Sequence, residues 1–440
     1  MVVSWLRRGV TGAGFLIPAL ALAVPSGYSW GALLLCVCAV GLLLTVYRTC
    51  KPTGVWLVFA VAVGLLSLIY ATNANTDQGW LWNGLDRPLK FWLALLAMAA
   101  VVHSPVAPHV LKWGIWLGSL GAGATAAHQM MWRGMPRAEG YTNAIQFGDI
   151  ALLFGLWSWA WAYQDSGRTR WLGWLAGFSG IYACAASQSR GGWVVAPVLL
   201  ALLVWSQRAT RHTARPWAQR VLLGGGGFLA SVLALTLAFQ VPIFKERVTA
   251  VVHEIEFFQQ DQGRAASAET SVGQRLAHWR LAFQMGLDKP LLGWGEEGYK
   301  REKRRRTEAG EAPPILAEFG HAHNDWLEVW VKYGVVGMLV LGFVLGSPGV
   351  AYWRVLRQPP TSALGAQGQR RAVAVCGLLL VVGYVGFGQT QVMFAHNSGT
   401  MVYLFMNLLF LSVCATSNQI RPEVMTTNRP NALPGGSEPR

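Results

Sequence analysis

The stretch AVAVCGLLLVVGYVGFGQTQV, residues 372–392, contains no charged side chain. A helix needs roughly 20 apolar residues to cross the hydrocarbon core of a bilayer, so this stretch alone predicts a membrane span. Other stretches of the same character predict a polytopic all-α protein with about twelve transmembrane helices. The predicted spans are 10–24, 29–47, 54–71, 89–103, 109–131, 147–164, 171–188, 191–206, 221–241, 324–350, 372–392 and 399–416.

The composition agrees with a membrane protein. Of the 440 residues, 53% are hydrophobic and only 13% are charged, whereas about a quarter of an average soluble domain is charged. An ordinary cytosolic globule and a disordered chain are therefore excluded. Arg7 and Arg8 precede the first apolar run, but further spans follow directly and no convincing cleavage site is present. We therefore interpret 10–24 as a span rather than as a signal peptide.

The formal net charge of +15 follows from the predicted topology. Positive charge in short loops sets the orientation of a membrane protein. With both termini inside, the cytoplasmic loops and tail hold half of the 36 basic residues. The short outer loops hold only Arg87, Lys90, Arg133, Arg137 and Arg190. Binding to nucleic acid, the usual explanation of a strongly basic soluble protein, is therefore not expected.

Residues 242–323, which we name the charged segment, differ from the rest of the chain. They contain 12 basic and 12 acidic residues, a composition that belongs in water or at the membrane interface. The predicted organisation is transmembrane helices 1–9 in 1–241, a large periplasmic segment with short helices in 242–323, transmembrane helices 10–12 in 324–416, and a tail in 417–440. The tail is polar and rich in Pro and Gly, so it is predicted to be disordered and cytoplasmic.

Two helices are predicted in the charged segment. In VTAVVHEIEFFQQ, residues 248–260, the apolar side chains share one face, which lies either along the membrane surface or against the bundle. The second helix is predicted to begin at Ser271, which resembles an N-cap, and to end at Pro290. Arg275 and Arg280 are about 140° apart around this helix, so both cannot easily hold one group, and both could simply be solvated.

The sequence GHAHNDWLEVWVKYGVVG, residues 320–337, stands at the start of a predicted span. His323 and Asn324 are followed by nine residues, then Gly334 and Gly337, a pattern written HN-x9-GxxG. At this point the chain resembles the O-antigen ligase and polymerase superfamily of bacterial inner-membrane glycosyltransferases. Earlier stretches resemble further motifs of that family, in the family's order, and the resemblance covers roughly residues 130–420. These stretches are RAEGYTNAIQFGD (137–149), SQSRGGW (187–193) and GQRLAHW (273–279).

The resemblance implies an enzyme that uses no metal and no other cofactor. It implies transfer of a glycan from an undecaprenyl-diphosphate carrier to an acceptor hydroxyl, at the periplasmic face of the bacterial inner membrane. The implied partners are the lipid-linked glycan donor, a lipid A-core acceptor and the lipid bilayer. Direct displacement at the anomeric carbon would invert its configuration. The charged segment contains no Asp-x-Asp motif, which also argues against a metal-dependent transferase.

Arginines suit the carrier diphosphate, because a guanidinium group stays charged and offers a planar fork to phosphate oxygens. Arg190 stands beside Gln188 between two apolar runs, where a charge is costly unless it snorkels to the interface. The motif match favours a functional role, in which Arg190 and Arg275 stabilise the leaving group. The residues predicted to bind substrate are Arg280, His321, Asn324, Arg133, Arg137 and Gln188.

His323 is predicted to be the general base. An unperturbed imidazole titrates near about pH 6.5, so a useful fraction is neutral and able to take a proton from an attacking sugar hydroxyl. Asn324 is interpreted as a cap or an orienting group, and His321 is a rival base. His396, in FAHNSGT, repeats the HN dipeptide without the glycine spacing, so we predict a structural or supporting role.

Other charged residues allow two interpretations. Asp325 and Glu328 favour the dipole at the start of a helix, although either could hold the imidazole. The run REKRRR, residues 301–306, is either solvated or in contact with phosphates of the acceptor or of lipid headgroups. Arg133 and Arg137 are predicted to add to a basic approach for the diphosphate or the acceptor.

Several activities share these motifs. Ligation to lipid A-core is preferred, because no large folded region is expected after the last span. An O-antigen polymerase is the runner-up, and a protein O-oligosaccharyltransferase is a further alternative. A flippase for lipid-linked glycans would also need many spans and intramembrane arginines. It would need no base, so replacement of His323 would distinguish a flippase from a transferase.

Overall fold

The computed structural model describes residues 1–46, 54–72, 81–165, 167–208, 242–261, 265–358 and 365–415. Within these ranges every regular element is a helix, which confirms the predicted all-α class. The predicted span 221–241 and the predicted tail 417–440 lie outside the described residues.

Each predicted span that falls in the described ranges coincides with a helix. Six of the described helices, α2, α3, α8, α14, α15 and α16, are long and apolar enough to cross a bilayer. A multi-pass membrane protein is therefore supported, while the count of twelve spans stays a prediction. The apolar helices are α1 (Val2–Leu20), α2 (Gly27–Val46), α3 (Val55–Thr72), α4 (Leu81–His103), α5 (Pro108–Ala127), α6 (Ala144–Gln164), α7 (Arg170–Ser187), α8 (Arg190–Arg208), α14 (Asp325–Arg357), α15 (Ala366–Phe387) and α16 (Asn397–Ala415).

Some helix ends differ from the predicted spans. α1 begins at Val2, so Arg7 and Arg8 lie on the exposed surface of the helix rather than ahead of it. α5 ends at Ala127, and a π-helix, His128–Trp132, continues it to the end of the predicted span. Hydropathy places a boundary where charged residues begin, whereas a helix continues for as long as its backbone hydrogen bonds form.

Small residues allow the central helices to approach closely. α6 packs along α7, where a Cβ atom on Gly155 would lie 2.8 Å from the carbonyl oxygen of Gly177. A Cβ atom on Gly180 would lie 2.7 Å from the carbonyl oxygen of Ala151. α16 contacts α4, α14 and α15, and 94% of its span is buried, so it lies at the centre of the bundle.

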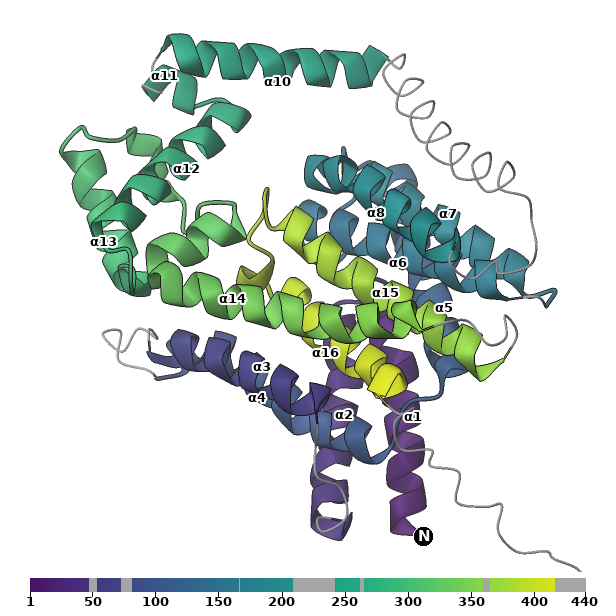
Figure 1. Ribbon diagram of the computed structural model, residues 1–440. Helices are drawn as coiled ribbons and strands as arrows, with labels where there is room; N and C mark the ends of the chain where they lie inside the picture. The colour runs from purple at the N-terminus through teal and green to yellow at the C-terminus, as the bar shows by residue number, and fades with distance from the viewer. Residues whose placement is uncertain are drawn as a thin grey trace, which may run out of the picture.

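The charged segment forms a group of helices at the Asp325 end of α14 (Figure 1), and the prediction of short helices was wrong for α10 and α12, which have 19 and 18 residues. α12, α13 and η2 enclose a small apolar core of their own. The cap of α12 is Thr270, whose Oγ1 accepts a hydrogen bond from the Gly273 backbone N–H at 3.0 Å. The predicted cap at Ser271 was therefore wrong by one residue, and the predicted end at Pro290 by two. The elements are α10 (Pro242–Gln260), α11 (Ala265–Ala268), α12 (Ser271–Asp288), α13 (Gly295–Glu308) and the 3₁₀-helix η2 (Pro314–Glu318).

α10 lies at the outer side of this group, beyond α11 and α12 (Figure 1). Glu254 fixes it to α12, because its Oε2 accepts a hydrogen bond from the Val272 backbone N–H at 2.7 Å. Val252 and Phe257 nevertheless remain 47% and 42% exposed. Contact with α12 therefore covers only part of the helix, and contact with a membrane surface stays a prediction for the rest.

α14 is interrupted at Gly334, where φ is 61°. The turn that follows α12 packs into this break, and the Val335 backbone N–H donates to the Pro290 carbonyl oxygen at 2.8 Å. A Cβ atom on Gly334 would lie 2.4 Å from the carbonyl carbon of Leu291. The first glycine of the HN-x9-GxxG motif thus combines a positive φ with a close backbone approach, which only glycine accommodates without strain. It joins the charged segment to the apolar helix.

Candidate active site

The histidine motif forms a short loop between η2 and α14. Asn324 caps α14, since its Oδ1 accepts hydrogen bonds from the backbone N–H groups of Trp326 at 2.9 Å and Leu327 at 3.1 Å. Its Nδ2 donates to the Gln389 carbonyl oxygen at 3.0 Å, and the residue is 6% exposed. These contacts agree with the cap interpretation and leave little of the side chain for a substrate. His323, just before the cap, has a φ of 52°, a strained conformation that clusters at functional sites.

The backbone of Ala322, between the two histidines, is held on both sides. Its N–H donates to Glu328 Oε2 at 2.8 Å. Its carbonyl oxygen accepts a hydrogen bond from Trp279 Nε1 at 3.1 Å, so the tryptophan of the Arg-x-x-x-Trp stretch fixes this loop. The Asp325 carboxylate accepts a hydrogen bond from the Met393 backbone N–H at 3.0 Å. The carboxylates of Asp325 and Glu328 therefore both accept hydrogen bonds from backbone N–H groups. The alternative that one of them orients the His323 imidazole gains no support from these contacts.

A buried ion-pair network fixes Glu328. The Lys332 ammonium contacts Glu328 Oε1 and donates to the two oxygens of Glu296 at 2.8 and 2.9 Å. Arg87 Nη1 lies 3.9 Å from Glu296 Oε2. Burial opposes ionisation of Glu296, but Lys332 and Arg87 hold the pKa of this carboxyl below its ordinary value. The network joins α4, α13 and α14 next to the histidine loop.

Four histidine rings gather around this loop. The ring centroid of His323 lies 4.4 Å from that of His321 and 6.5 Å from that of His278, and the rings of His321 and His396 are 5.9 Å apart. Burial lowers the pKa of His321 to about 4 and that of His278 to about 4. Burial, followed by the charge of Arg275, also lowers the pKa of His323. The His323 ring is therefore neutral near neutral pH, and its buried Nδ1 has no hydrogen-bond partner among the described residues.

Arg190 is the first residue of α8 and is half-buried. The preceding turn is fixed by Ser189, whose Oγ donates to Asp149 Oδ1 at 2.7 Å. A Cβ atom on Gly192 would lie 2.9 Å from the same oxygen, so the two glycines after Arg190 allow close packing against α6. Nη1 of Arg190 is buried and has no hydrogen-bond partner within the described ranges. A guanidinium nitrogen in that state can donate to an anion.

Arg190, Arg275 and His323 come together although they are far apart in the sequence. Burial, followed by the charge of Arg190, lowers the pKa of Arg275. Arg275 in turn lowers the pKa of His323. The contacts agree with this, because Trp279, four residues after Arg275 on α12, donates to the carbonyl oxygen of Ala322, the residue before His323. The two predicted diphosphate-binding residues and the predicted base therefore lie in one site.

The turn between α15 and α16 links these residues. A Cβ atom on Gly191 would lie 2.3 Å from Thr390 Oγ1, so the start of α8 is in contact with the turn. Gln391, the next residue of the turn, forms a side-chain hydrogen bond with His323 that partly offsets the lowering of the histidine pKa. Gln391 is 3% exposed. No sequence motif singled it out, because its position depends on how α15 and α16 pack.

α12 separates its two arginines, as the helix geometry predicted. Arg275 is half-buried and approaches the site, whereas Arg280 is exposed on another face of the helix. A role for Arg280 in substrate binding stays a prediction.

The loop between α5 and α6 carries the remaining predicted residues. Gln188 is exposed, and its Nε2 donates to the Pro136 carbonyl oxygen at 2.8 Å, which joins this loop to the start of α8. Arg137 Nε lies 3.4 Å from Glu139 Oε1 at the surface. Arg133 lines a separate cavity of about 310 Å³. The loop therefore approaches the site through Gln188, and substrate contacts of its arginines are untested.

The basic run REKRRR is not uniformly solvated. Lys303 is 2% exposed, and its Nζ donates to the Phe319 carbonyl oxygen just before the histidine loop. Burial lowers the pKa of Lys303 to about 8. Arg305 and Arg306 pair with Glu302 on the same helix. The charge count of the run could not reveal which side chains face inward, because that depends on the packing of α13.

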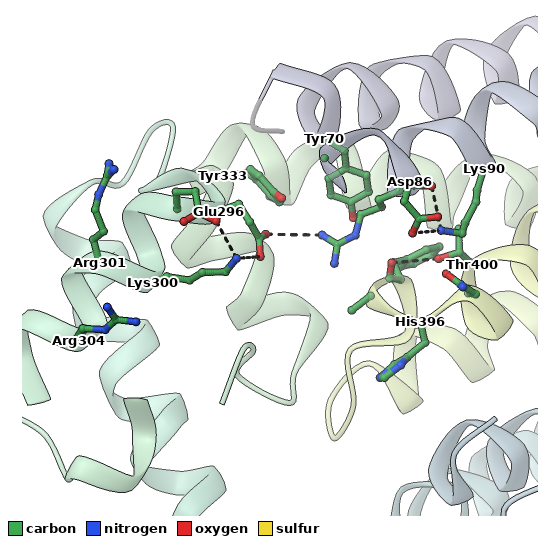
Figure 2. A pocket seen from close by; sticks show the side chains of 16 residues that line it. Tyr70, Asp86, Lys90, Glu296, Lys300, Arg301, Arg304, Tyr333, His396 and Thr400 are labelled. Carbon is green, nitrogen blue, oxygen red and sulfur yellow. Dashed lines mark hydrogen bonds and ion pairs between the residues drawn. The ribbon is translucent and has the colours of Figure 1, made fainter. Parts of the chain in front are cut away.

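A cavity of about 640 Å³ beside His396 was missed by the sequence analysis. Figure 2 shows Lys300, Arg301 and Arg304 from α13 on one side of it and Lys90 from α4 on the other. The spacing of the three α13 residues could have indicated a shared basic face. Nothing in the sequence indicated that α4 would lie opposite them.

The fold and the site together define a multi-pass membrane protein with arginine and histidine side chains clustered where its apolar helices meet a charged segment. Residues 175–342 match the family model described as O-antigen ligase. The match supports the resemblance to the O-antigen ligase superfamily that the motifs predicted. The matched residues include Arg190, Arg275 and His323. This family indicates a glycosyltransferase-like enzyme of the ligase and polymerase type.

A protein from Haemophilus influenzae, described as uncharacterized, is similar over most of its length. It is 22% identical over 409 residues, which cover 89% of this chain and 94% of that protein. Within the described ranges, no three His, Cys, Asp or Glu residues are grouped so that they could hold a metal ion. The metal-free scheme stays a prediction.

Proposed function

We propose that this protein transfers an O-antigen glycan from undecaprenyl diphosphate to a hydroxyl of lipid A-core, at the periplasmic face of the inner membrane. The O-antigen ligase match over residues 175–342 supports the reaction class. The choice of lipid A-core as the acceptor follows the ligase description of the matching family and is tested separately below.

In the proposed mechanism His323 is the base. Its lowered pKa keeps the imidazole neutral, so it can take the proton of the acceptor hydroxyl as that oxygen bonds to the anomeric carbon. The bond between the anomeric carbon and the carrier phosphate breaks at the same time, and its electron pair stays on the phosphate oxygen. Arg190 and Arg275 stabilise the negative charge that develops there. Attack opposite the leaving group inverts the configuration.

The convergence of Arg190, Arg275 and His323 is the observation that carries this proposal. Two guanidinium groups that lie near each other repel, and an anion bound between them relieves that repulsion. A diphosphate has the charge to do so, and the unpartnered Nη1 of Arg190 is available to it. A neutral base next to the same cations suits transfer chemistry better than transport.

The test is glycan transfer by the purified protein in proteoliposomes. His323→Ala should lower turnover by roughly 10²- to 10⁴-fold, the usual contribution of a general base. His253→Ala is the matched control, because His253 lies on α10 with a side chain that is 71% exposed. Near-normal transfer by His323→Ala, or lipid-linked glycan translocation that is equal in both variants without transfer, would favour a flippase instead.

The choice of acceptor is tested in the same preparation. Lipid A-core, a carrier-linked repeat unit and a protein acceptor are offered separately with the same donor. Product on lipid A-core supports the ligase, chain extension on the carrier identifies a polymerase, and glycosylated protein identifies an oligosaccharyltransferase. Activity should be unchanged by a chelator, and a strict Mg²⁺ requirement would contradict the metal-free scheme.

A further inference from the structure

Half of the residues that line the cavity beside His396 carry charged side chains. Its volume is about 640 Å³, and five of its lining side chains are cations while three are carboxylates. Each carboxylate is matched by one of the cations. The ion pairs are Lys90–Asp86 at 2.6 Å, Lys300–Glu297 at 2.8 Å and Arg87–Glu296 at 3.9 Å.

Arg301 and Arg304 are the remaining cations of this cavity. Within the described part of the chain, their guanidinium groups form no ion pair and no hydrogen bond. They are three residues apart on α13 and therefore neighbours on one face of the helix. Figure 2 shows both on the α13 side of the cavity, without the dashed contacts that Lys300 makes. Arg305, on the same helix, is by contrast paired with Glu302 and Glu311.

The cavity is connected to the proposed base through the histidine rings. His396 lines the cavity, its ring lies 5.9 Å from that of His321, and that ring lies 4.4 Å from His323. Different arginines act on the two outer histidines of this row. The charge of Arg275 lowers the pKa of His323. The pKa of His396 is lowered mainly by burial, then by His323, and then by the charge of Arg87, which lines the cavity. The histidines thus lie near both groups of cations, Arg275 beside His323 and Arg87 beside His396.

Transfer requires this kind of arrangement. The leaving diphosphate needs cations on one side of the base, and the acceptor must reach the base from another direction. A phosphate ester carries between one and two negative charges near neutral pH, with several acceptor oxygens that match two neighbouring guanidinium groups. A neutral sugar would leave both arginines without a partner.

We propose that this cavity binds a phosphate ester carried by the acceptor, with Arg301 and Arg304 as its ligands, and so directs the acceptor hydroxyl toward His321 and His323. The inference rests on the proposed function, because it assumes that an acceptor is glycosylated at this site. It adds the site that would bind a phosphate of that acceptor and the residues that would hold it.

The test is direct binding, which does not require turnover. Phosphorylated lipid A-core and the same lipid after phosphatase treatment are titrated onto the protein in nanodiscs of zwitterionic lipid. The double variant Arg301→Gln/Arg304→Gln should raise the Kd of the phosphorylated acceptor roughly tenfold or more, the size expected for lost hydrogen bonds to a charged group. The Kd of the dephosphorylated acceptor should not change. Arg305→Gln, on the same helix but outside the cavity lining, should behave as the wild type.

Two results would overturn the inference. One is an equal Kd for the phosphorylated acceptor in the double variant and the wild type. The other is equal binding of both acceptor forms once anionic phospholipid is present, which would mean that bilayer headgroups occupy the cavity. Turnover assays keep the two proposals apart. If the double variant loses phosphate-dependent binding but no protein, the wild type included, transfers glycan, the acceptor site stands and the ligase proposal is rejected. If glycan is transferred but the double variant binds the phosphorylated acceptor as the wild type does, the ligase proposal stands and the acceptor site is rejected.

Discussion

Replacement of Lys332 by Met should destabilise the junction between α13 and α14 by about 3 kcal/mol. The Lys332 side chain is 1% exposed and is bound by Glu296 and by Glu328, of which Glu328 is 4% exposed. Removal of one partner from a buried ion pair costs about 3–5 kcal/mol, because the other charge stays buried without compensation. The lower end applies here, since Glu296 is 25% exposed and keeps Arg87 at 3.9 Å.

Hydrogen exchange measured by mass spectrometry checks this value. A loss of about 3 kcal/mol predicts roughly hundredfold faster exchange at the amides of α13 and of the histidine loop. The Ala322 N–H is the most informative amide, because it donates to Glu328. Lys300→Met is the matched control. Lys300 contacts the same Glu296 at 4.0 Å, but its side chain is 47% exposed, so its loss should cost about 1 kcal/mol or less and raise exchange about fivefold at most.

A second substitution tests the physical reason. Glu328→Gln added to Lys332→Met removes the uncompensated buried charge, so part of the lost protection should return. Equal exchange in the Lys332→Met and Lys300→Met proteins would refute the reasoning, because it would mean that burial does not distinguish the two ion pairs.

Three further predictions concern the site. The acidic limb of the pH profile of kcat/KM should lie below the ordinary histidine pKa of about 6.5, because the pKa of His323 is lowered. Arg275→Gln should move that limb to higher pH, because it removes a charge that repels the protonated imidazole. A limb that does not move would show that Arg275 does not lie near the base. Trp279→Phe should lower kcat by roughly tenfold with little change in the donor KM, because the Ala322 carbonyl oxygen loses its hydrogen bond and the histidine loop is held less firmly. A change confined to KM would contradict this positioning role of Trp279. Thr270→Ala should destabilise the first turn of α12 by about 1 kcal/mol, which amide exchange in that turn would detect, and unchanged exchange would show that the cap contributes nothing.

The apolar helices could be read from the sequence because bilayer thickness imposes a local rule. Any stretch such as 372–392 that is long enough and free of charge predicts a span, whatever it packs against. The charged segment and the motifs could be located in the same way, because each is defined by the order and chemistry of neighbouring residues. Helix ends were less accurate, as at Thr270, because a cap depends on the conformation of one residue rather than on composition.

The roles of individual motif residues depended on contacts that the sequence does not contain. Asn324 was predicted to be a cap or a substrate ligand, and its hydrogen bonds to the start of α14 and to Gln389 agree with the first. Glu328 holds the Ala322 backbone, and Gly334 admits the turn after α12. Each contact joins residues whose proximity results from the packing of separate helices.

By itself the sequence determined the helical class, the apolar stretches, the charged segment and the family resemblance, because each of these depends on the order and chemistry of nearby residues. Only the tertiary structure decided that Arg190, Arg275 and His323 share one site and that α4 and α13 enclose a cationic cavity beside His396. The physical reason is that helices pack through shape and small-residue contacts spread over the whole bundle. Such contacts bring together side chains whose separation along the chain carries no record of their distance in space.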